Sequence, residues 1–394
     1  MQKILMKTTR KAGFPTLVNC RILRIPLILV LLIMLKINIL TLGQHPQGIQ
    51  NASVTVIMTT YTYPVAMSTD GSYVSGAYFG GAVNYFWSQA TGVIQVSGTV
   101  YGVSDAGVTT GTFSNPNLLY NGSNVESAGL WDPGTSQWNF LGVNPGSPSP
   151  FSTDYNSGWD ITADGSTVVG LQFYPGYNYS AFKWTQTGGY VDIGSGVGSG
   201  SRASGISSDG SVIFGWAQLP TASRTPVIWY NGQIIYINAT QQGEAFGAST
   251  SGNYVTGSIG NLGFLWSPQS TVTFSNTLNT GSINPSTVTN NGAVFGYTDT
   301  SWPPSPTARR AFARDTNGVL MTFNDYAEAR GLENAQQWTF YSINDVSADG
   351  QKFLGAGKNP AGQNITFIME FPVLAPVISA NPQSIDFGTH PAGT

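Results

Sequence analysis

Residues 206–216 read ISSDGSVIFGW, and this stretch contains the pattern that decides the fold. Ser207 is followed by Asp209-Gly210 and then by an apolar run that ends at Gly215. Asp-Gly between two apolar segments is typical of a β-hairpin with a type I′ turn, in which both central residues need a positive φ. The pattern therefore predicts a tight hairpin, with the Ser207 side chain hydrogen-bonded to the turn backbone.

The same block occurs seven times along the 394 residues: Ser or Thr, two further residues, Gly, and an apolar run that ends in a second Gly. Neighbouring blocks are between 36 residues (Gly71 to Gly107) and 58 residues (Gly107 to Gly165) apart. These distances are within or near the span of a four-stranded propeller blade with insertions. The first glycines of the blocks are Gly71, Gly107, Gly165, Gly210, Gly252, Gly292 and Gly350.

Each unit contains a second apolar segment that ends in a bulky residue, and a polar turn and a further apolar segment follow, which predicts four strands per unit. Because the bulky residue recurs at one phase of the repeat, we interpret it as a packing element and not as a ligand site. Its burial predicts that Trp184→Ala costs roughly 3 to 5 kcal/mol. The residues at this position are Trp87, Trp131, Trp184, Trp229, Trp266, Arg314 and Met369.

Seven antiparallel units in series are best closed as a ring, because radial repetition leaves only short, protected sheet edges. The sequence thus predicts an all-β, seven-bladed β-propeller over residues 53–372. The last unit lacks a fourth strand, since Pro372 and Pro376 follow its third. Ser53–Thr60 has strand composition and no unit of its own, so we expect it to pair with blade seven and close the ring. An open stack of hairpins or a β-solenoid is the alternative.

A leader is indicated by the charges, because seven of the sixteen Lys and Arg residues lie in the first 36 positions, around an apolar run from Ile25 to Leu35. We expect residues 1–43 to be a signal peptide cleaved before Gln44, and the protein to be secreted or on the bacterial cell surface. An uncleaved anchor over residues 25–42 is the alternative, and it would be the only membrane contact. The single cysteine, Cys20, lies in this leader, so disulfides are not expected.

Without the leader the chain has nine basic and 19 acidic residues and a formal charge of −10. Nucleic acid is therefore not expected as a partner, because its binding requires clustered Lys and Arg that displace counterions from phosphates. We expect a monomer.

The repeat resembles that of the bacterial extracellular proteins known for HAF repeats. The resemblance rests on residues 206–216, on Ala181–Trp184 and on the closing stretch from Gly331 to Pro372, and it covers about residues 65–372. It implies a secreted or surface-exposed, propeller-like protein without a shared enzymatic activity. The chain lacks the histidine of the repeat's name, so the match is to the Asp-Gly turn and the tryptophan pattern.

Residues 373–394 differ in character from the repeats. Asn381–Gly388 looks like the first strands of an immunoglobulin-like domain found after such propellers. A complete domain of that kind needs about 100 residues. We therefore expect residues 373–394 to be a linker and the start of an incomplete immunoglobulin-like domain.

Catalytic and metal chemistry find little support in the repeats. His45 and His390 are the only histidines and lie outside them, so neither a Ser-His-Asp triad nor a histidine metal site is expected within the ring. Calcium is conceivable at the turn aspartates, but these occur singly in separate units, and a calcium loop needs several converging ligands. No cofactor is therefore expected. Paired carboxylates could hydrolyse glycosides at a suitable separation, and the candidates are Glu126, Asp132, Asp154 and Asp160.

Three insertions are the best candidates for binding, because functional residues tend to lie on loops that a rigid scaffold holds. They are Phe113–Glu126, Thr298–Arg310 and Asn324–Trp338. A cationic patch on an otherwise acidic protein could form there, with neutralisation by Asp315, Asp325, Glu328 and Glu333 as the alternative. The candidate binding residues are Trp302, Arg309, Arg310, Arg314 and Arg330.

The sequence favours a non-catalytic binding or scaffold module for glycans or proteins. An extracellular polysaccharide-cleaving enzyme that uses acidic residues on the propeller face is one alternative. A purely architectural spacer in a longer surface protein is the other.

Overall fold

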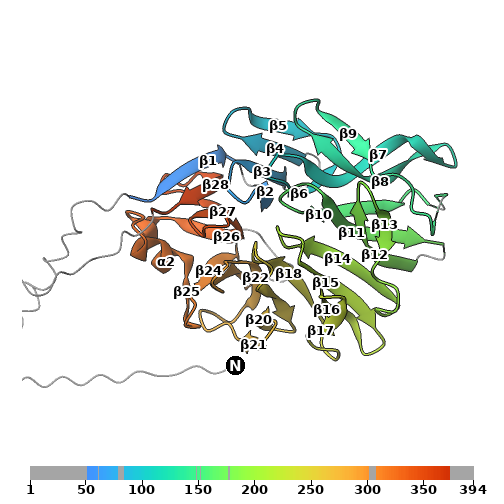
Figure 1. Ribbon diagram of the computed structural model, residues 1–394. Helices are drawn as coiled ribbons and strands as arrows, with labels where there is room; N and C mark the ends of the chain where they lie inside the picture. The colour runs from blue at the N-terminus through green and yellow to red at the C-terminus, as the bar shows by residue number, and fades with distance from the viewer. Residues whose placement is uncertain are drawn as a thin grey trace, which may run out of the picture. The chain divides into compact units, whose positions relative to one another are not determined.

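The computed structural model describes residues 51–372, apart from residues 61, 79–83, 148, 151, 176–177 and 301–307. The described residues form seven four-stranded antiparallel sheets, arranged as the blades of a β-propeller (Figure 1). The predicted all-β, seven-bladed architecture is confirmed. The expected signal peptide or anchor with Cys20, both histidines and the expected immunoglobulin-like fragment lie outside the described residues.

Six blades follow the chain from their innermost to their outermost strand. Blade 1 has β2 (Thr62–Met67), β3 (Tyr73–Tyr78), β4 (Asn84–Ser88) and β5 (Gly92–Val96). Blade 2 has β6 (Thr99–Val103), β7 (Thr109–Tyr120), β8 (Ser123–Asp132) and β9 (Gln137–Phe140). Blade 3 has β10 (Asn156–Ile161), β11 (Thr167–Tyr174), β12 (Asn178–Thr185) and β13 (Gly189–Asp192). Blade 4 has β14 (Gly200–Ile206), β15 (Val212–Leu219), β16 (Ala222–Tyr230) and β17 (Gln233–Tyr236). Blade 5 has β18 (Gly243–Ala248), β19 (Val255–Ile259), β20 (Leu262–Ser267) and β21 (Ser270–Phe274). Blade 6 has β22 (Ser282–Val288), β23 (Val294–Asp299), β24 (Arg310–Arg314) and β25 (Leu320–Thr322).

Blade 7 closes the ring with a strand from the other end of the described chain. It contains β26 (Thr339–Val346), β27 (Lys352–Lys358) and β28 (Asn364–Glu370), and its outermost strand is β1 (Ser53–Met58). β1 is antiparallel to β28, with Ser53 opposite Glu370 and Val56 opposite Phe367. The expected pairing of residues 53–60 with the last blade is confirmed.

The repeated turns join the first and second strands of each blade, but they are not type I′ turns as predicted. Gly210 has φ 77°, whereas Asp209 is not among the residues with positive φ. The Gly210 N–H donates to the Ser207 carbonyl at 2.8 Å, and the hairpin closes through a bond from Ser207 N to Val212 O. Four residues thus lie between the bonded pair, and a type I′ hairpin has room for only two. Type I′ geometry is found instead at Asn231-Gly232, where both φ angles are positive.

The expected role of the Ser or Thr is confirmed in all seven turns. The Ser207 hydroxyl accepts a hydrogen bond from Val212 N at 3.0 Å and donates one to Asp209 at 2.6 Å. The equivalent acceptors are Ser68, Ser104, Thr162, Ser249, Thr289 and Ser347.

Hydrogen bonds also join each turn to the next, around the propeller axis. Most of them involve the second residue of the turn, which we number from the Ser or Thr. The connections are Thr69 N to Asp105 Oδ1 (2.7 Å), Asp105 N to Ala163 O (2.8 Å), Ala163 N to Ser208 O (3.0 Å), Asp209 N to Thr250 O (3.2 Å), Ser251 N to Asn290 Oδ1 (3.0 Å), Asn290 Nδ2 to Ala348 O (3.0 Å) and Ala348 N to Thr69 O (2.8 Å). We call this closed chain of bonds the turn ring.

Two of the predicted insertions have regular structure. Phe113–Glu126 continues β7 and β8 into a long hairpin that closes at Asn121-Gly122. The segment 324–338 contains the helix α2 (Phe323–Ala329) and the 3₁₀ turn η2 (Ala335–Gln337), and Thr322 caps α2 by accepting from Asp325 N. Phe323 is fully buried, with its ring centroid 5.1 Å from that of Phe340. The helix therefore packs against blades 6 and 7, and ligand binding by this segment stays a prediction.

The recurring tryptophans lie at equivalent places on the third strands, but they are not equally buried. Trp131 is 2% exposed and packs on Phe86 of blade 1, at a centroid distance of 5.3 Å. Trp184 and Trp229 are only half-buried. The sequence-based cost for Trp184→Ala assumed full burial and is therefore too high.

We expect Trp131→Ala to lower the free energy of unfolding by about 3 to 5 kcal/mol, because it removes a fully buried ring between two blades. For Trp184→Ala we expect about half of that, since less apolar area leaves water on folding. Urea unfolding of the two variants and the parent measures both values. Equal losses would show that burial does not decide the role of this position.

Candidate binding site in the central channel

A cavity of ≈ 440 Å³ lies on the propeller axis and is lined by residues from all seven blades. The innermost strand of each blade has a β-bulge at the same place, three residues before the Ser or Thr of the turn. A bulge bends its strand and redirects a side chain. The residues at this position all line the cavity, and they are Val65, Tyr101, Trp159, Ser204, Phe246, Ser286 and Asn344.

The two ends of the channel differ. All innermost strands run in one direction and end in the turns, so the turn ring surrounds one end, where Thr69, Ser208 and Thr250 line the cavity. At the opposite end lie residues that precede the bulge position, among them Arg202 and Glu244. We call this opposite end, with Trp159, Arg202, Arg224 and Glu244, the arginine end.

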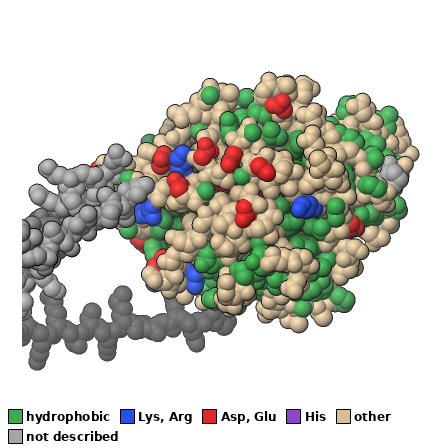
Figure 2. All heavy atoms as spheres, in the orientation of Figure 1, with side chains coloured by type: hydrophobic (Ala, Val, Ile, Leu, Met, Phe, Trp, Pro, Cys, Tyr) green, Lys and Arg blue, Asp and Glu red, His purple; other side chains and the backbone are tan. Residues whose placement is uncertain are grey.

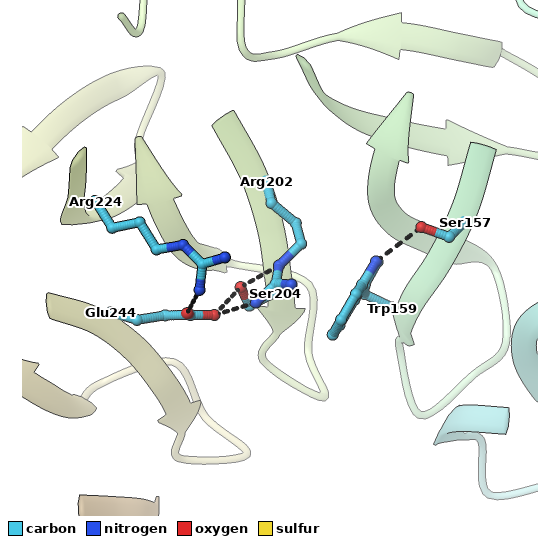
Figure 3. Close-up of polar contacts among 6 residues, drawn as sticks. All are labelled: Ser157, Trp159, Arg202, Ser204, Arg224 and Glu244. Atoms are coloured by element: carbon cyan, nitrogen blue, oxygen red, sulfur yellow. Dashed lines mark hydrogen bonds and ion pairs between the residues drawn. The ribbon is translucent and has the colours of Figure 1, made fainter. Parts of the chain in front are cut away.

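Glu244 from blade 5 holds two arginines of blade 4 at the arginine end (Figure 3). Its Oε1 accepts from Arg202 Nη2 and, at 2.8 Å, from the Ser204 hydroxyl. Its Oε2 lies 3.6 Å from Arg224 Nη1. Arg202 also donates through Nε to Ser204, at 3.1 Å. The network fixes two guanidinium groups beside the cavity by bonds between neighbouring blades.

Aromatic rings flank these charges. The Arg202 guanidinium lies 3.7 Å from the centroid of Trp159, whose other neighbour is Tyr101, stacked at 4.4 Å. Trp159 Nε1 donates to Ser157 at 2.9 Å, which orients the indole (Figure 3). The Arg224 guanidinium lies 4.7 Å from the Trp216 ring, and its side chain is 55% exposed. Planar cations over aromatic rings form a surface that suits a ligand with both apolar faces and negative charge.

Burial affects the charges of this cluster. Desolvation lowers the pKa of Arg202 from its ordinary value, and the Glu244 carboxylate opposes that shift. The pKa of Tyr101 is raised by burial, with Arg202 acting in the opposite direction. The largely buried Arg202 thus holds the cluster together, while the more exposed guanidinium of Arg224 is accessible to a ligand.

Two carboxyl groups lie deeper in the channel, one residue after the bulge position of their strands. Asp160 accepts hydrogen bonds from Ile161 N at 2.8 Å and from Ile206 N of blade 4 at 2.9 Å. Asp345 accepts from Val346 N and, across blades, from Met67 N, both at 2.8 Å. Burial raises the pKa of Asp160 to about 7 and that of Asp345 to about 6, against the lowering effect of these backbone bonds. Both acids therefore act as links between blades.

The arginines chosen from the sequence have separate surroundings. Arg309 lies 3.5 Å from Asp299 and over the ring of Tyr297, at 4.1 Å. Its guanidinium is also 5.8 Å from the Tyr63 ring, and Tyr63 precedes Val65 by two residues, as Arg202 precedes Ser204, so Arg309 lies on the face of the propeller where the arginine end opens. Arg310 is exposed and donates to the Arg309 carbonyl.

The other two candidates lie elsewhere. Arg314 lies over Phe274 of blade 5 at 4.8 Å, and Arg330 contacts Tyr326 and Phe371 beside blade 7. On the face drawn in Figure 2, Lys and Arg side chains are scattered singly, while acidic side chains gather in one area. Trp302 lies outside the described residues. Ligand binding by these five residues stays a prediction.

The acidic candidates are also dispersed. Asp132 accepts from Gly134 N in a turn, and Asp160 lies in the channel. Glu126 and Asp154 form an isolated β-bridge, and burial, followed by the charge of Asp154, raises the pKa of Glu126. Of the four candidate acids, Glu126 and Asp154 therefore lie next to each other, outside the channel.

The sequence analysis missed Trp159, Arg202, Arg224, Glu244 and Phe246. The signal for two of them was present, because Trp159 and Phe246 occupy the third position before the turn Ser or Thr, where the seven repeats differ in size and polarity. The arginine–glutamate network had no signal of its own, since Arg202 and Glu244 belong to different repeats.

Among the described residues, no three His, Cys, Asp or Glu side chains form a group that could hold a metal ion. Within the same residues, no helix is long and apolar enough to cross a membrane. The absence of a cofactor and of nucleic-acid partners, and the monomeric state, stay predictions.

The raised pKa values of Asp160 and Asp345 predict a stability that falls as pH rises from about 4 to about 7. In this range the native state keeps protons that the unfolded chain has lost. Each retained proton therefore lowers the free energy of unfolding by about 1.4 kcal/mol per pH unit. We expect Asp160→Asn to make this decline shallower. Asp164→Asn is the control, because hydrogen bonds lower the pKa of that exposed turn carboxyl, so its removal does not make the decline shallower. Urea midpoints measured from pH 4 to pH 7 test this, and parallel curves for parent and Asp160→Asn would contradict it.

The chain matches no protein-family model and no curated protein. Among solved structures, the β-propeller domain of the Trilobed protease from Pyrococcus furiosus aligns with a TM-score of 0.48 and 9% identity, over 78% of this chain and 95% of that one. Putative TolB from Agrobacterium tumefaciens gives 0.39 and 14%, over 82% and 98%. TolB from Acinetobacter baumannii gives 0.37 and 16%, and the match covers 54% of this chain but only 51% of that protein. These similarities concern the fold alone, and the resemblance to HAF-repeat proteins stays a prediction.

Proposed function

We propose that the chain is a non-catalytic binding module, secreted or on the cell surface, that takes its ligand at the arginine end of the channel. The observation that carries the proposal is the fixed cluster of Trp159, Arg202, Arg224 and Glu244, in which Trp159, Arg202 and Glu244 line the cavity and Glu244 holds the half-exposed Arg224 beside them. Rigid placement of such groups lowers the entropic cost of binding.

The charge of the cluster favours an anionic ligand. Two arginines share one glutamate, which leaves one positive charge in excess, and Arg309 lies on the same face of the propeller. Arg202, Arg224 and Arg309 are three of only nine basic residues after position 43. Their concentration on an acidic chain supports a carboxylate-bearing glycan, whose sugar faces can stack on indole rings while its acid groups pair with guanidinium. An acidic segment of a surface protein is the second ligand class.

Catalysis is supported less well. The enzyme alternative rests on the Glu126–Asp154 pair, in which the raised pKa of Glu126 suits a proton donor. That pair lies away from the channel, and Asp160 and Asp345 use their oxygens to bind backbone amides of neighbouring blades. An architectural spacer would need no exposed guanidinium at the channel.

A hexasaccharide of galacturonic acid, titrated calorimetrically, tests the proposal. We expect Arg224→Ala to weaken binding about tenfold or more, because it removes the exposed cation without opening the core. Lys352→Ala is the control, since it also removes one positive charge but at the turn end of blade 7, where Lys352 Nζ donates to the Asp70 carbonyl. Absence of binding, an equal loss in both variants, or cleavage of the oligosaccharide would contradict the assignment.

A further inference from the structure

A second cavity, of ≈ 660 Å³, lies on blade 2, beside its long hairpin. The strands β7 and β8 have 12 and 10 residues and extend past the outer strand β9, which pairs only with Gly129–Asp132. The space left beside this extension is a groove. We call it the blade 2 groove, and its main lining residues are Phe113, Asn115, Asn117, Glu126, Gln137 and Trp138.

Two parallel, stacked rings form one wall of the groove. Phe113 and Trp138 are stacked, with centroids 5.3 Å apart and planes inclined by 5°. Trp138 Nε1 donates to the Ser97 carbonyl at 2.6 Å, which fixes the indole on the link between blades 1 and 2. Glycines make room beneath the rings, since a Cβ at Gly129 would lie 2.8 Å from Phe113 Cε1 and one at Gly111 would lie 2.8 Å from Trp138 Cη2. The platform is therefore built into the sheet, and Trp138 remains half-exposed.

Amide groups form the polar part. Asn115 is 1% exposed, and its Oδ1 accepts from Asn117 N at 3.0 Å. Its Nδ2 has no hydrogen-bond partner among the described residues, although an unsatisfied buried donor typically costs about 1 to 3 kcal/mol. Asn117 and Gln137 are exposed beside it. The groove thus combines an unpaired amide donor, Asn115 Nδ2, and the exposed amides of Asn117 and Gln137 with an aromatic wall.

The charges of the groove differ from those of the channel. Its described lining residues include no Lys or Arg, and its only ionisable group is Glu126, with Asp154 nearby. An anionic ligand would be repelled, and a cationic one would leave the amide groups without a specific role. Neutral sugars fit all three features, because a pyranose presents a face of C–H groups for stacking and a rim of hydroxyls for amides and a carboxyl group.

We propose that the blade 2 groove binds a neutral oligosaccharide, stacked on Trp138, which the buried Phe113 supports, and hydrogen-bonded by Asn115, Asn117 and Gln137. This site is separate from the channel and adds a second ligand class to the proposed function. A chain with both sites holds a neutral glycan and an anionic ligand at once.

Calorimetric titration with three neutral hexasaccharides (β-1,4-glucan, β-1,4-xylan and α-1,4-glucan) tests the groove. We expect at least one of them to bind, Trp138→Ala to weaken that binding more than tenfold, and Asn117→Ala to weaken it about threefold to tenfold. Trp229→Ala is the matched control, because Trp229 is also half-buried and also donates its ring N–H to a carbonyl on a link between blades, Ile193 O at 2.8 Å.

The outcomes separate this site from the channel. Arg224→Ala must leave neutral binding unchanged, and Trp138→Ala must leave the binding of the galacturonic acid hexasaccharide unchanged. The exposed Asn117→Ala keeps the test decisive if Trp138→Ala does not fold. The proposal is overturned if no neutral hexasaccharide binds at millimolar concentration, if Asn117→Ala and a folded Trp138→Ala bind like the parent, or if Trp229→Ala loses binding equally.

Discussion

The turn ring is the interaction on which the rest of the structure depends. Contacts between blades are mostly apolar, and apolar packing has no direction of its own. The bonds between turns are directional, and they join each blade to the next from Thr69 around to Ala348 and back. They can form because the Ser or Thr hydroxyl accepts a backbone N–H within each turn. The second residue of the turn is then left to bond its neighbour, so a local sequence motif sets the angle between sheets.

A fixed turn also fixes what faces the axis. The bulge lies three residues before the Ser or Thr in every blade, so the side chain at that position lines the channel whatever its type. Within each repeat, the turn residues thereby determine the fold, and the residue at the bulge position determines what lines the channel. The first turn residue is Ser or Thr and the fourth is Gly in every blade, while the bulge position ranges from Val65 and Ser204 to Trp159. Seven similar repeats can therefore form one asymmetric site.

The architecture was predictable because it depends on periodic features. Seven Gly-containing turns, four apolar segments per unit and a spare strand at Ser53–Thr60 led to the correct ring and its closure. The turn type was not correct, because the loop from Ser207 to Val212 is longer than the Asp-Gly pair suggests. The unequal burial of Trp131 and Trp184 depends on the neighbouring blade, which the local sequence does not describe.

The candidate site was harder to find, because it joins residues that are far apart in the chain. Arg309 was chosen as part of a loop patch and lies instead near Tyr63, on the face of the propeller where Arg202 and Glu244 meet. Charge counts identified the rarity of arginine, but only the ring geometry brings three of them to one face.

The pairing of β1 with β28 has a mechanical consequence. Ser53 lies opposite Glu370, so the described chain enters and leaves the propeller side by side, at the same end of one antiparallel ladder. A pull on the two flanks loads that ladder one rung at a time, in an unzipping geometry, and does not shear all its bonds together. The blades behind it bear little of the load until the last rung separates. Tension would therefore open the circle at this seam, and the six sheets that follow the chain order would part later.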